Sequence, residues 1–201
     1  MKIVDALKHG YFETRNTLYP EYQTRGFVRQ LKNEYNGKSL VGAEIGTHMG
    51  YHALMLLYHN NIDRLYLIDP YESYDDYELP YEGKKDLRIH NDETHHDAFI
   101  FANKLLKKYK DRIVFVKKYA VDAVDFIPGG LDFTYLDDNH TYKFVKQNTE
   151  LYYTKVRDGG IFGGHDFSPG YGVPYAVLEF AEENGLLEKL GGGKLDWWIK
   201  K

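Results

Sequence analysis

The chain has 201 residues, no cysteine, 43% hydrophobic and 28% charged residues, and a formal net charge of −4. This length suits one α/β domain with a full core, and the mixture of residues is that of an ordinary soluble globular protein. The absence of cysteine excludes disulfides, thiolate metal ligands and a cysteine nucleophile, and the negative charge argues against binding along a nucleic-acid backbone.

The N-terminal residues and the lengths of the apolar runs indicate where in the cell the protein is expected. Residues 1–11 are mixed polar and lack the apolar core of a signal peptide. No apolar run in the chain is long enough to span a bilayer. We therefore expect a cytoplasmic protein that binds neither membranes nor nucleic acid, with residues 1–201 forming a single domain.

The first predicted elements are a leading helix, a strand, a buried helix and a second strand. Apolar residues share one side of a segment that we predict to be helical from Tyr19 to Tyr35. We interpret residues 1–37 as an N-terminal helical cover, either over a site or at a homodimer contact. The next elements are predicted at Ser39–Ile45 (strand), Tyr51–His59 (helix) and Arg64–Ile68 (strand).

The stretch at residues 70–91 breaks the pattern. It is polar and rich in tyrosine, it contains Pro80 and Gly83, and it shows no clean period. Long irregular segments inside compact domains are usually functional or mobile. Two interpretations stay open: a lid insertion that stacks on a substrate, or a surface loop that packs on itself.

Helices and strands then alternate to the C-terminus. The predicted helices are Asp92–Tyr109, Ala120–Phe126, Tyr142–Val156 and Val173–Glu183, and the predicted strands are Ile113–Val116, Leu131–Leu136 and Ile161–Gly164. Asp158-Gly159-Gly160 is predicted to end the third of these helices, because glycine suits the left-handed cap. Leu186–Leu190 and Leu195–Ile199 flank three glycines and predict a closing hairpin.

This alternation predicts an α/β fold. We expect a Rossmann-like, doubly wound and mostly parallel sheet of about seven strands, with an antiparallel C-terminal hairpin and helices on both faces. In such sheets ligands bind at the carboxyl ends of the strands, near the point where the strand order reverses. The residues that directly follow each strand are therefore the candidates for a site.

A glycine turn joins the first strand to its helix and reads Glu44-Ile45-Gly46-Thr47-His48-Met49-Gly50. Gly46 allows a tight turn and the close approach of a ligand, and Gly50 allows the helix to pack closely. The spacing is neither the dinucleotide pattern G-x-G-x-x-G nor a P-loop. The alternative to a ligand site is a tight turn that binds nothing.

The spacing E-x-G-x-x-x-G resembles the first motif of class I S-adenosylmethionine-dependent methyltransferases. The resemblance implies S-adenosyl-L-methionine as the cofactor, with Glu44 positioning its methionine ammonium group. The implied cofactor residues of the turn are Glu44, Gly46, Thr47, His48 and Gly50.

Two further positions fit the same cofactor. Asp69 directly follows the second strand, where an acidic side chain commonly accepts hydrogen bonds from ribose hydroxyls. Its alternative role is to cap the next segment. Ala120 and Val121 follow the third strand, where the methyltransferase resemblance implies contacts with the adenine ring.

An acidic–histidine cluster follows the fourth and fifth strands. Its order and spacing resemble a small-molecule O-methyltransferase subfamily, with the matching residues Asp137, His140, Tyr142, Gly159, Gly160, His165 and Asp166. Asp137 and Asp166 end neighbouring strands, so that their carboxylates can converge on one cation such as Mg²⁺. His165 is the third predicted metal ligand, and an imidazole favours Mn²⁺, Fe²⁺ or Zn²⁺ more than Mg²⁺. The alternative is an Asp-His pair that supports the strand end through hydrogen bonds and binds no metal.

The predicted catalytic residues are Asp137, which we also expect to border the cofactor, and His140. In the similar catechol-type O-methyltransferases, the cation lowers the pKa of the acceptor hydroxyl, and a lysine base stands where this chain has His140. A histidine titrates near neutral pH and can take the acceptor proton. Alternatively, His140 caps the helix that begins at Thr141.

We therefore expect methyl transfer from S-adenosyl-L-methionine to a hydroxyl of a small molecule, with or without a divalent metal. The acceptor oxygen would attack the sulfonium methyl in line, and the protein would mainly orient the reactants. One alternative is a non-catalytic binding protein on the same fold. Another is a metal-dependent, hydroxylase-like enzyme that does not consume the cofactor.

Overall fold

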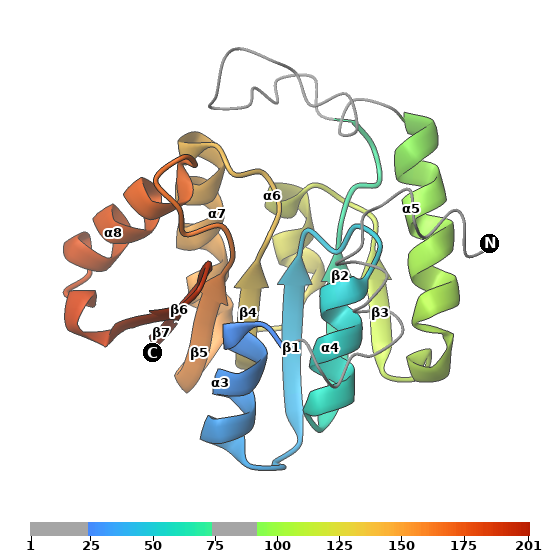
Figure 1. The fold of residues 1–201 in the computed structure, drawn as a ribbon, viewed down its shortest axis with the longest axis horizontal. Helices are drawn as coiled ribbons and strands as arrows, with labels where there is room; N and C mark the ends of the chain where they lie inside the picture. The colour runs from blue at the N-terminus through green and yellow to red at the C-terminus, as the bar shows by residue number, and fades with distance from the viewer. Residues whose placement is uncertain (1–23, 74–91) are drawn as a thin grey trace.

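Residues 24–73 and 92–201 are described by a computed structural model, in which one sheet of seven strands forms the centre (Figure 1). The strands lie in the order β3-β2-β1-β4-β5-β7-β6. Strands β1 to β5 pair in parallel, and β7 and β6 add an antiparallel edge. The strands are β1 (Leu40–Ile45), β2 (Ile62–Ile68), β3 (Ile113–Val116), β4 (Leu131–Leu136), β5 (Val156–Gly164), β6 (Leu190–Gly193) and β7 (Asp196–Lys200).

Helices cover both faces of the sheet, as the sequence predicts (Figure 1). One apolar cluster packs α3 and α4 against the sheet, and the other packs α6, α7 and α8 against the opposite face. No helix within the described ranges is both long and apolar enough to cross a membrane. The helices are α3 (Gly26–Tyr35), α4 (Tyr51–His59), α5 (Asp92–Leu105), α6 (Ala120–Ala123), α7 (Tyr142–Lys155) and α8 (Val173–Glu183), with 3-10 turns at η2 (Lys107–Tyr109), η3 (Val124–Phe126) and η4 (Leu187–Lys189).

The N-terminal helix is shorter than predicted. It begins at Gly26 and not at Tyr19, because Thr24 and Arg25 are not helical. Arg25 has an extended backbone (ψ 157°) and points its side chain to the ends of the strands. The remainder of the predicted N-terminal cover, residues 1–23, and most of the predicted lid, residues 74–91, lie outside the described residues.

Strand β5 begins five residues earlier than predicted, directly after α7. Asp158, Gly159 and Gly160 therefore lie inside a strand and do not cap a helix. The pairing of β5 with β4 shifts register at this point. A Cβ atom on Gly160 would lie 2.9 Å from the carbonyl oxygen of Asp132, so the irregular strand itself requires a glycine there.

The closing hairpin is confirmed, although its first strand is displaced. The three glycines form most of β6, and the predicted strand Leu186–Leu190 is largely a 3-10 turn. Trp198 explains why a glycine stands in this strand, because a Cβ atom on Gly191 would lie 2.5 Å from its indole nitrogen. The indole ring of Trp198 lies against β6, so the residue that pairs with it there, Gly191, has no room for a side chain.

Candidate functional site

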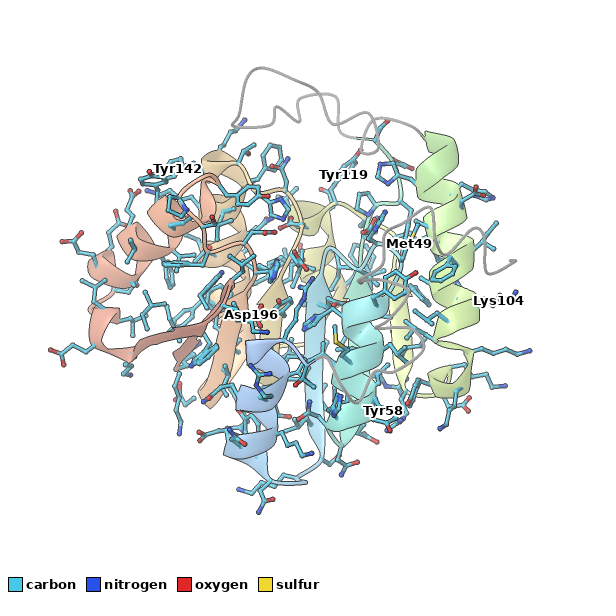
Figure 2. All side chains as sticks on the ribbon, viewed as in Figure 1. Met49, Tyr58, Lys104, Tyr119, Tyr142 and Asp196 are labelled. Carbon is cyan, nitrogen blue, oxygen red and sulfur yellow. The ribbon has the colours of Figure 1, made fainter. Side chains whose placement is uncertain are left out.

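The predicted site residues gather at the carboxyl ends of the parallel strands. The chain order reverses between β1 and β4, where Ile45 pairs with Leu136 and the amide of Asp137 donates to the carbonyl of Ile45 (2.7 Å). Figure 2 shows Met49 and Tyr119, from the turns after β1 and β3, in the upper part of the molecule above these strand ends. The turn after β1 and the loop after β4 are therefore neighbours, as the switch-point rule predicts.

The glycines in the turn after β1 are required by contacts with other parts of the protein. Gly46 has φ +90°, and a Cβ atom on it would lie 2.1 Å from the carbonyl oxygen of Asp137. Gly50, with φ +78°, precedes α4 and packs against Leu106, 3.1 Å from where its Cβ would be. The close neighbour of Gly46 on its Cβ side is thus the crossing backbone after β4.

Glu44 is a buried carboxylate with one oxygen bonded and one not. It is 1% exposed, and its Oε1 lies 2.7 Å from Nδ1 of His52, which is also buried. Its Oε2 and the hydroxyl of Thr47 are buried without a hydrogen bond of good geometry among the described residues. Burial and the nearby charge of Asp137 raise the pKa of Glu44 well above its ordinary value, and Arg25 partly opposes them.

Asp69 braces the glycine turn. Its two carboxylate oxygens accept hydrogen bonds from the amides of His48 and Tyr71, each at 2.8 Å. The hydroxyl of Tyr71 in turn donates to the carbonyl of His48 (3.0 Å). The capping alternative weighed for Asp69 is therefore realised, and each of its oxygens retains a lone pair for a further donor.

The two predicted adenine contacts differ in exposure. Ala120 is buried at the start of α6, and its carbonyl accepts a hydrogen bond from the hydroxyl of Tyr152 (2.8 Å). Val121 is 45% exposed. Only the side chain of Val121 is thus open for contact with a flat ring in this state.

The acidic–histidine residues converge as the strand positions predict. Nε2 of His140 lies 2.9 Å from Asp166 and 3.7 Å from Asp137, and Nδ1 of His165 lies 3.2 Å and 3.8 Å from the same two carboxylates. One ligand atom from each of Asp137, His140 and Asp166 lies within 4.8 Å of the others. The imidazole of His140 thus belongs to the convergent group, and that of His165, the third ligand that the sequence predicts, lies at similar distances from the same two carboxylates, so the identity of a metal ligand stays a prediction.

His140 does not cap α7. The helix is preceded by Thr141, whose amide donates to Oδ1 of Asn139 (3.0 Å), so that Asn139 shapes this entry. The imidazole of His140 instead turns to the two carboxylates and packs edge-on against Tyr171, with ring centroids 5.2 Å apart. The described contacts of its imidazole are thus with the cluster, and its role as a base stays a prediction.

The cluster shifts the pKa of its members. Burial disfavours the imidazolium of His140, but hydrogen bonds to Asp137 and Asp166 outweigh it and raise the pKa to about 10. Burial likewise raises the pKa of Asp166, but the two histidines outweigh it and lower the value to about 2. Arg25 and His140 hold the pKa of Asp137 well below its ordinary value against the effect of its burial.

These shifts predict a pH-dependent contribution of His140 to stability. A folded-state pKa of about 10 against an ordinary value of 6.5 means that the stabilisation is complete below pH 6.5 and is lost as the pH rises towards 10. We expect the difference in free energy of unfolding between the wild type and His140→Gln to shrink across this window, as measured by urea denaturation. A difference that stays constant with pH would contradict the assigned ion pairs.

Arg25 is a site residue that the sequence interpretation missed. Its Nη1 donates to Asp137 (2.5 Å) and to the hydroxyl of Tyr135 (2.9 Å). Tyr135 donates to Asp196 (2.7 Å), which also accepts from the amide of Phe27 (2.8 Å). This buried chain of bonds fixes the start of α3 to the ends of β4 and β7, and no local sequence signal marks a pair that is 112 residues apart.

Comparison with known proteins identifies a family. A family model described as a methyltransferase domain matches residues 43–167, which include the second half of β1, the whole of β2 to β5 and both halves of the candidate site. A protein of Acanthamoeba polyphaga mimivirus, itself described as uncharacterized, is 26% identical over 141 residues. That match covers 70% of this chain but only 57% of the viral protein, so the chain spans little more than half the length of this relative.

Solved structures share the fold at low sequence identity. The O-methyltransferase NovP matches with a TM-score of 0.60 and 15% identity, covering 87% of this chain and 78% of its own. An O-methyltransferase from Bacillus cereus, in complex with SAH, matches with 0.58 and 14%, covering 99% and 95%. A precorrin 8W decarboxylase from Methanobacterium thermoautotrophicum matches with 0.59 and 13%, covering 90% and 92%. At such identities these likenesses show the fold alone, and they confirm the Rossmann-like class.

Proposed function

The chain belongs to the methyltransferase-domain family, and from this membership we propose that it transfers a methyl group from S-adenosyl-L-methionine to a hydroxyl of a small molecule. One observation carries the proposal: the Glu44 turn and the acidic–histidine cluster are adjacent across the β1–β4 switch point. A cofactor at the first and an acceptor at the second would therefore meet at a single place.

The proposed cofactor site uses the turn after β1. Oε2 of Glu44 and the hydroxyl of Thr47 are buried next to each other without a hydrogen bond of good geometry among the described residues, and the ammonium group of the cofactor would supply donors for both oxygens. Gly46, His48 and Gly50 complete the border of this turn. Asp69 would receive the ribose hydroxyls on its remaining lone pairs, and the adenine ring would lie over Ala120 and Val121.

The proposed acceptor hydroxyl lies beside His140. With a pKa of about 10 the imidazole is protonated near neutral pH, so it acts as a base only in the fraction that has lost this proton, a fraction that grows as the pH rises. In that form it accepts the hydroxyl proton, while the acceptor oxygen attacks the sulfonium methyl in line and the carbon–sulfur bond breaks, which yields S-adenosylhomocysteine. Asp166 and Asp137 stabilise the imidazolium that forms, because both carboxylates lie within 4 Å of its Nε2. In this proposal the proton from the acceptor hydroxyl ends on His140, and the two neighbouring carboxylates stabilise the charge that it brings.

The cluster also fits the divalent cation that the sequence analysis considers. Asp137 and Asp166 would hold it, with His165 or His140 as a third ligand, and oxygen ligands of this kind suit Mg²⁺ or Mn²⁺. When bound, such a cation would coordinate the acceptor oxygen and lower the pKa of its hydroxyl. Arg25 already compensates the charge of Asp137, so transfer without a metal is the competing form of the same proposal.

The test is formation of S-adenosylhomocysteine with a panel of catechols, phenols and sugar hydroxyls, with and without a chelator. We expect turnover by the wild type and a loss of about 100-fold in kcat for His140→Gln, since a general base contributes on the order of that factor. Binding of S-adenosylhomocysteine by the variant should be unchanged in calorimetry.

Three outcomes bear on separate parts of the proposal. A His140→Gln variant with wild-type kcat would remove the base from the mechanism. Activity that survives the chelator would remove the cation and leave Arg25 as the charge that balances Asp137. A wild type that binds the cofactor but methylates no hydroxyl on the panel would favour the non-catalytic or hydroxylase-like alternatives.

A further inference from the structure

His52 is a buried polar residue in a helix whose other buried residues are apolar. It lies in the first turn of α4, two residues after Gly50, and is 6% exposed. Placing an imidazole in such surroundings costs free energy unless it makes a hydrogen bond that the fold requires. Its side chain is hydrogen-bonded to Glu44, the residue at the centre of the proposed cofactor site.

The position of the imidazole is set from two sides. Nδ1 lies 2.7 Å from Oε1 of Glu44, and the ring stacks on Tyr135 with centroids 4.0 Å apart and planes 31° apart. Tyr135 is itself held through its hydroxyl by Arg25 and Asp196. The imidazole therefore offers Oε1 a fixed partner, and the carboxylate plane of Glu44 has little freedom to rotate.

The charge of this partner matters as much as its position. Burial and the nearby Arg25 lower the pKa of His52 well below its ordinary value, which favours a neutral ring. Towards a charged carboxylate, a neutral ring bonded through Nδ1 is the donor. A neutral donor orients a carboxylate without cancelling its charge, whereas a lysine or arginine at this place would do both. Oε2 is buried beside the hydroxyl of Thr47 and makes no hydrogen bond of good geometry among the described residues, so an ammonium group brought to it would favour the charged carboxylate, whose pKa burial otherwise raises.

We propose that His52 is a positioning residue for the amino-acid part of the cofactor: it binds Oε1 of Glu44 so that Oε2 is held ready for the cofactor's ammonium group. This inference rests on the proposed function, because it concerns how the same cofactor is recognised. It adds a specific consequence, since His52 would affect only ligands that carry the ammonium group.

The experiment is calorimetric titration with two ligands that differ in this group. S-adenosylhomocysteine carries the amino-acid part, and 5′-methylthioadenosine has the same thionucleoside without it. We expect His52→Phe, which keeps a ring against Tyr135 but removes the donor, to weaken binding of S-adenosylhomocysteine about tenfold. Its affinity for 5′-methylthioadenosine should stay within about twofold of the wild type by the same reasoning.

A pair of amide variants serves as the matched control and does not depend on the folding of His52→Phe. The amide of His52→Asn can take the place of Nδ1, so we expect it to retain the preference for S-adenosylhomocysteine. The amide of His52→Gln reaches the Nε2 position and should lose that preference. Thermal melting of each variant separates loss of binding from loss of folding.

The outcomes distinguish this inference from the function on which it rests. A wild type that binds neither ligand would overturn the cofactor site itself. A wild type that binds S-adenosylhomocysteine, with His52→Phe and His52→Gln equal to it, would overturn only the role of His52. An equal weakening of both ligands would also overturn it, because it would show a packing role for His52 without selectivity for the ammonium group.

Discussion

Glu44→Gln should weaken binding of S-adenosylhomocysteine by about 100-fold, since a buried hydrogen bond to a charged group contributes roughly 1.5–3 kcal/mol. The substitution preserves the size of the side chain but removes the charge that would attract the ammonium group. It also places an amide group where Oε1 now bonds to Nδ1 of His52 and where Oε2 is buried without a hydrogen bond of good geometry. Calorimetric titration of the purified variant measures the effect directly.

The matched control is Asp111→Asn, which makes the same change of charge. Asp111 is exposed in the turn before β3, at the opposite end of the strands from Glu44. We expect its affinity for S-adenosylhomocysteine to equal that of the wild type. A Glu44→Gln variant that also binds like the wild type would place the cofactor away from the turn after β1.

Gly46→Ala should destabilise the whole domain. The residue has φ +90°, and the added methyl group would lie 2.1 Å from the carbonyl oxygen of Asp137, a backbone atom that cannot move without shifting β4. Backbone strain and overpacking each cost about 1–3 kcal/mol, so together they remove a large part of a typical stability of roughly 5–15 kcal/mol. Urea denaturation followed by circular dichroism measures the loss.

Alanine substitutions at two other glycines separate the effect of backbone strain from the effect of the steric clash on stability. Gly37 has φ +80° with nothing within 4 Å of its Cβ position, so Gly37→Ala carries the strain without the clash. Gly129 has the same open surroundings without a positive φ, and Gly129→Ala should be close to neutral. If Gly46→Ala costs no more than Gly37→Ala, the close contact with Asp137 is not a constraint on the fold.

The local pattern of apolar and polar residues was sufficient to predict the bounds of several helices and strands that are buried on one or both faces. The bounds predicted for α4, β3, β4 and α8 agree with the structure, because a strand or helix bounded by polar residues shows its ends directly in the sequence. The bounds failed where the ends depend on partners elsewhere. Strand β5 begins early because it pairs with β4, and β6 is built from glycines because Trp198 lies across them.

The candidate site divides in the same way. The sequence places Glu44, Asp69, Asp137 and Asp166 together, since each follows a parallel strand and the carboxyl ends of such strands share one edge. His52 also left a signal that was not used, as the buried polar residue in the apolar helix YHALMLLYH. A polar residue at such a position calls for a partner, although the sequence does not say which.

The sequence by itself thus determined the fold class, the edge of the sheet at which the site lies, and the chemical types of residue gathered there. Only the tertiary structure decided that Arg25 binds Asp137, that His52 binds Glu44, and that His140 lies within reach of both Asp137 and Asp166. Periodicity and turn composition act over a few residues along the chain. Side-chain partners from distant segments depend on strand order, register and helix position, which the whole chain sets when it packs.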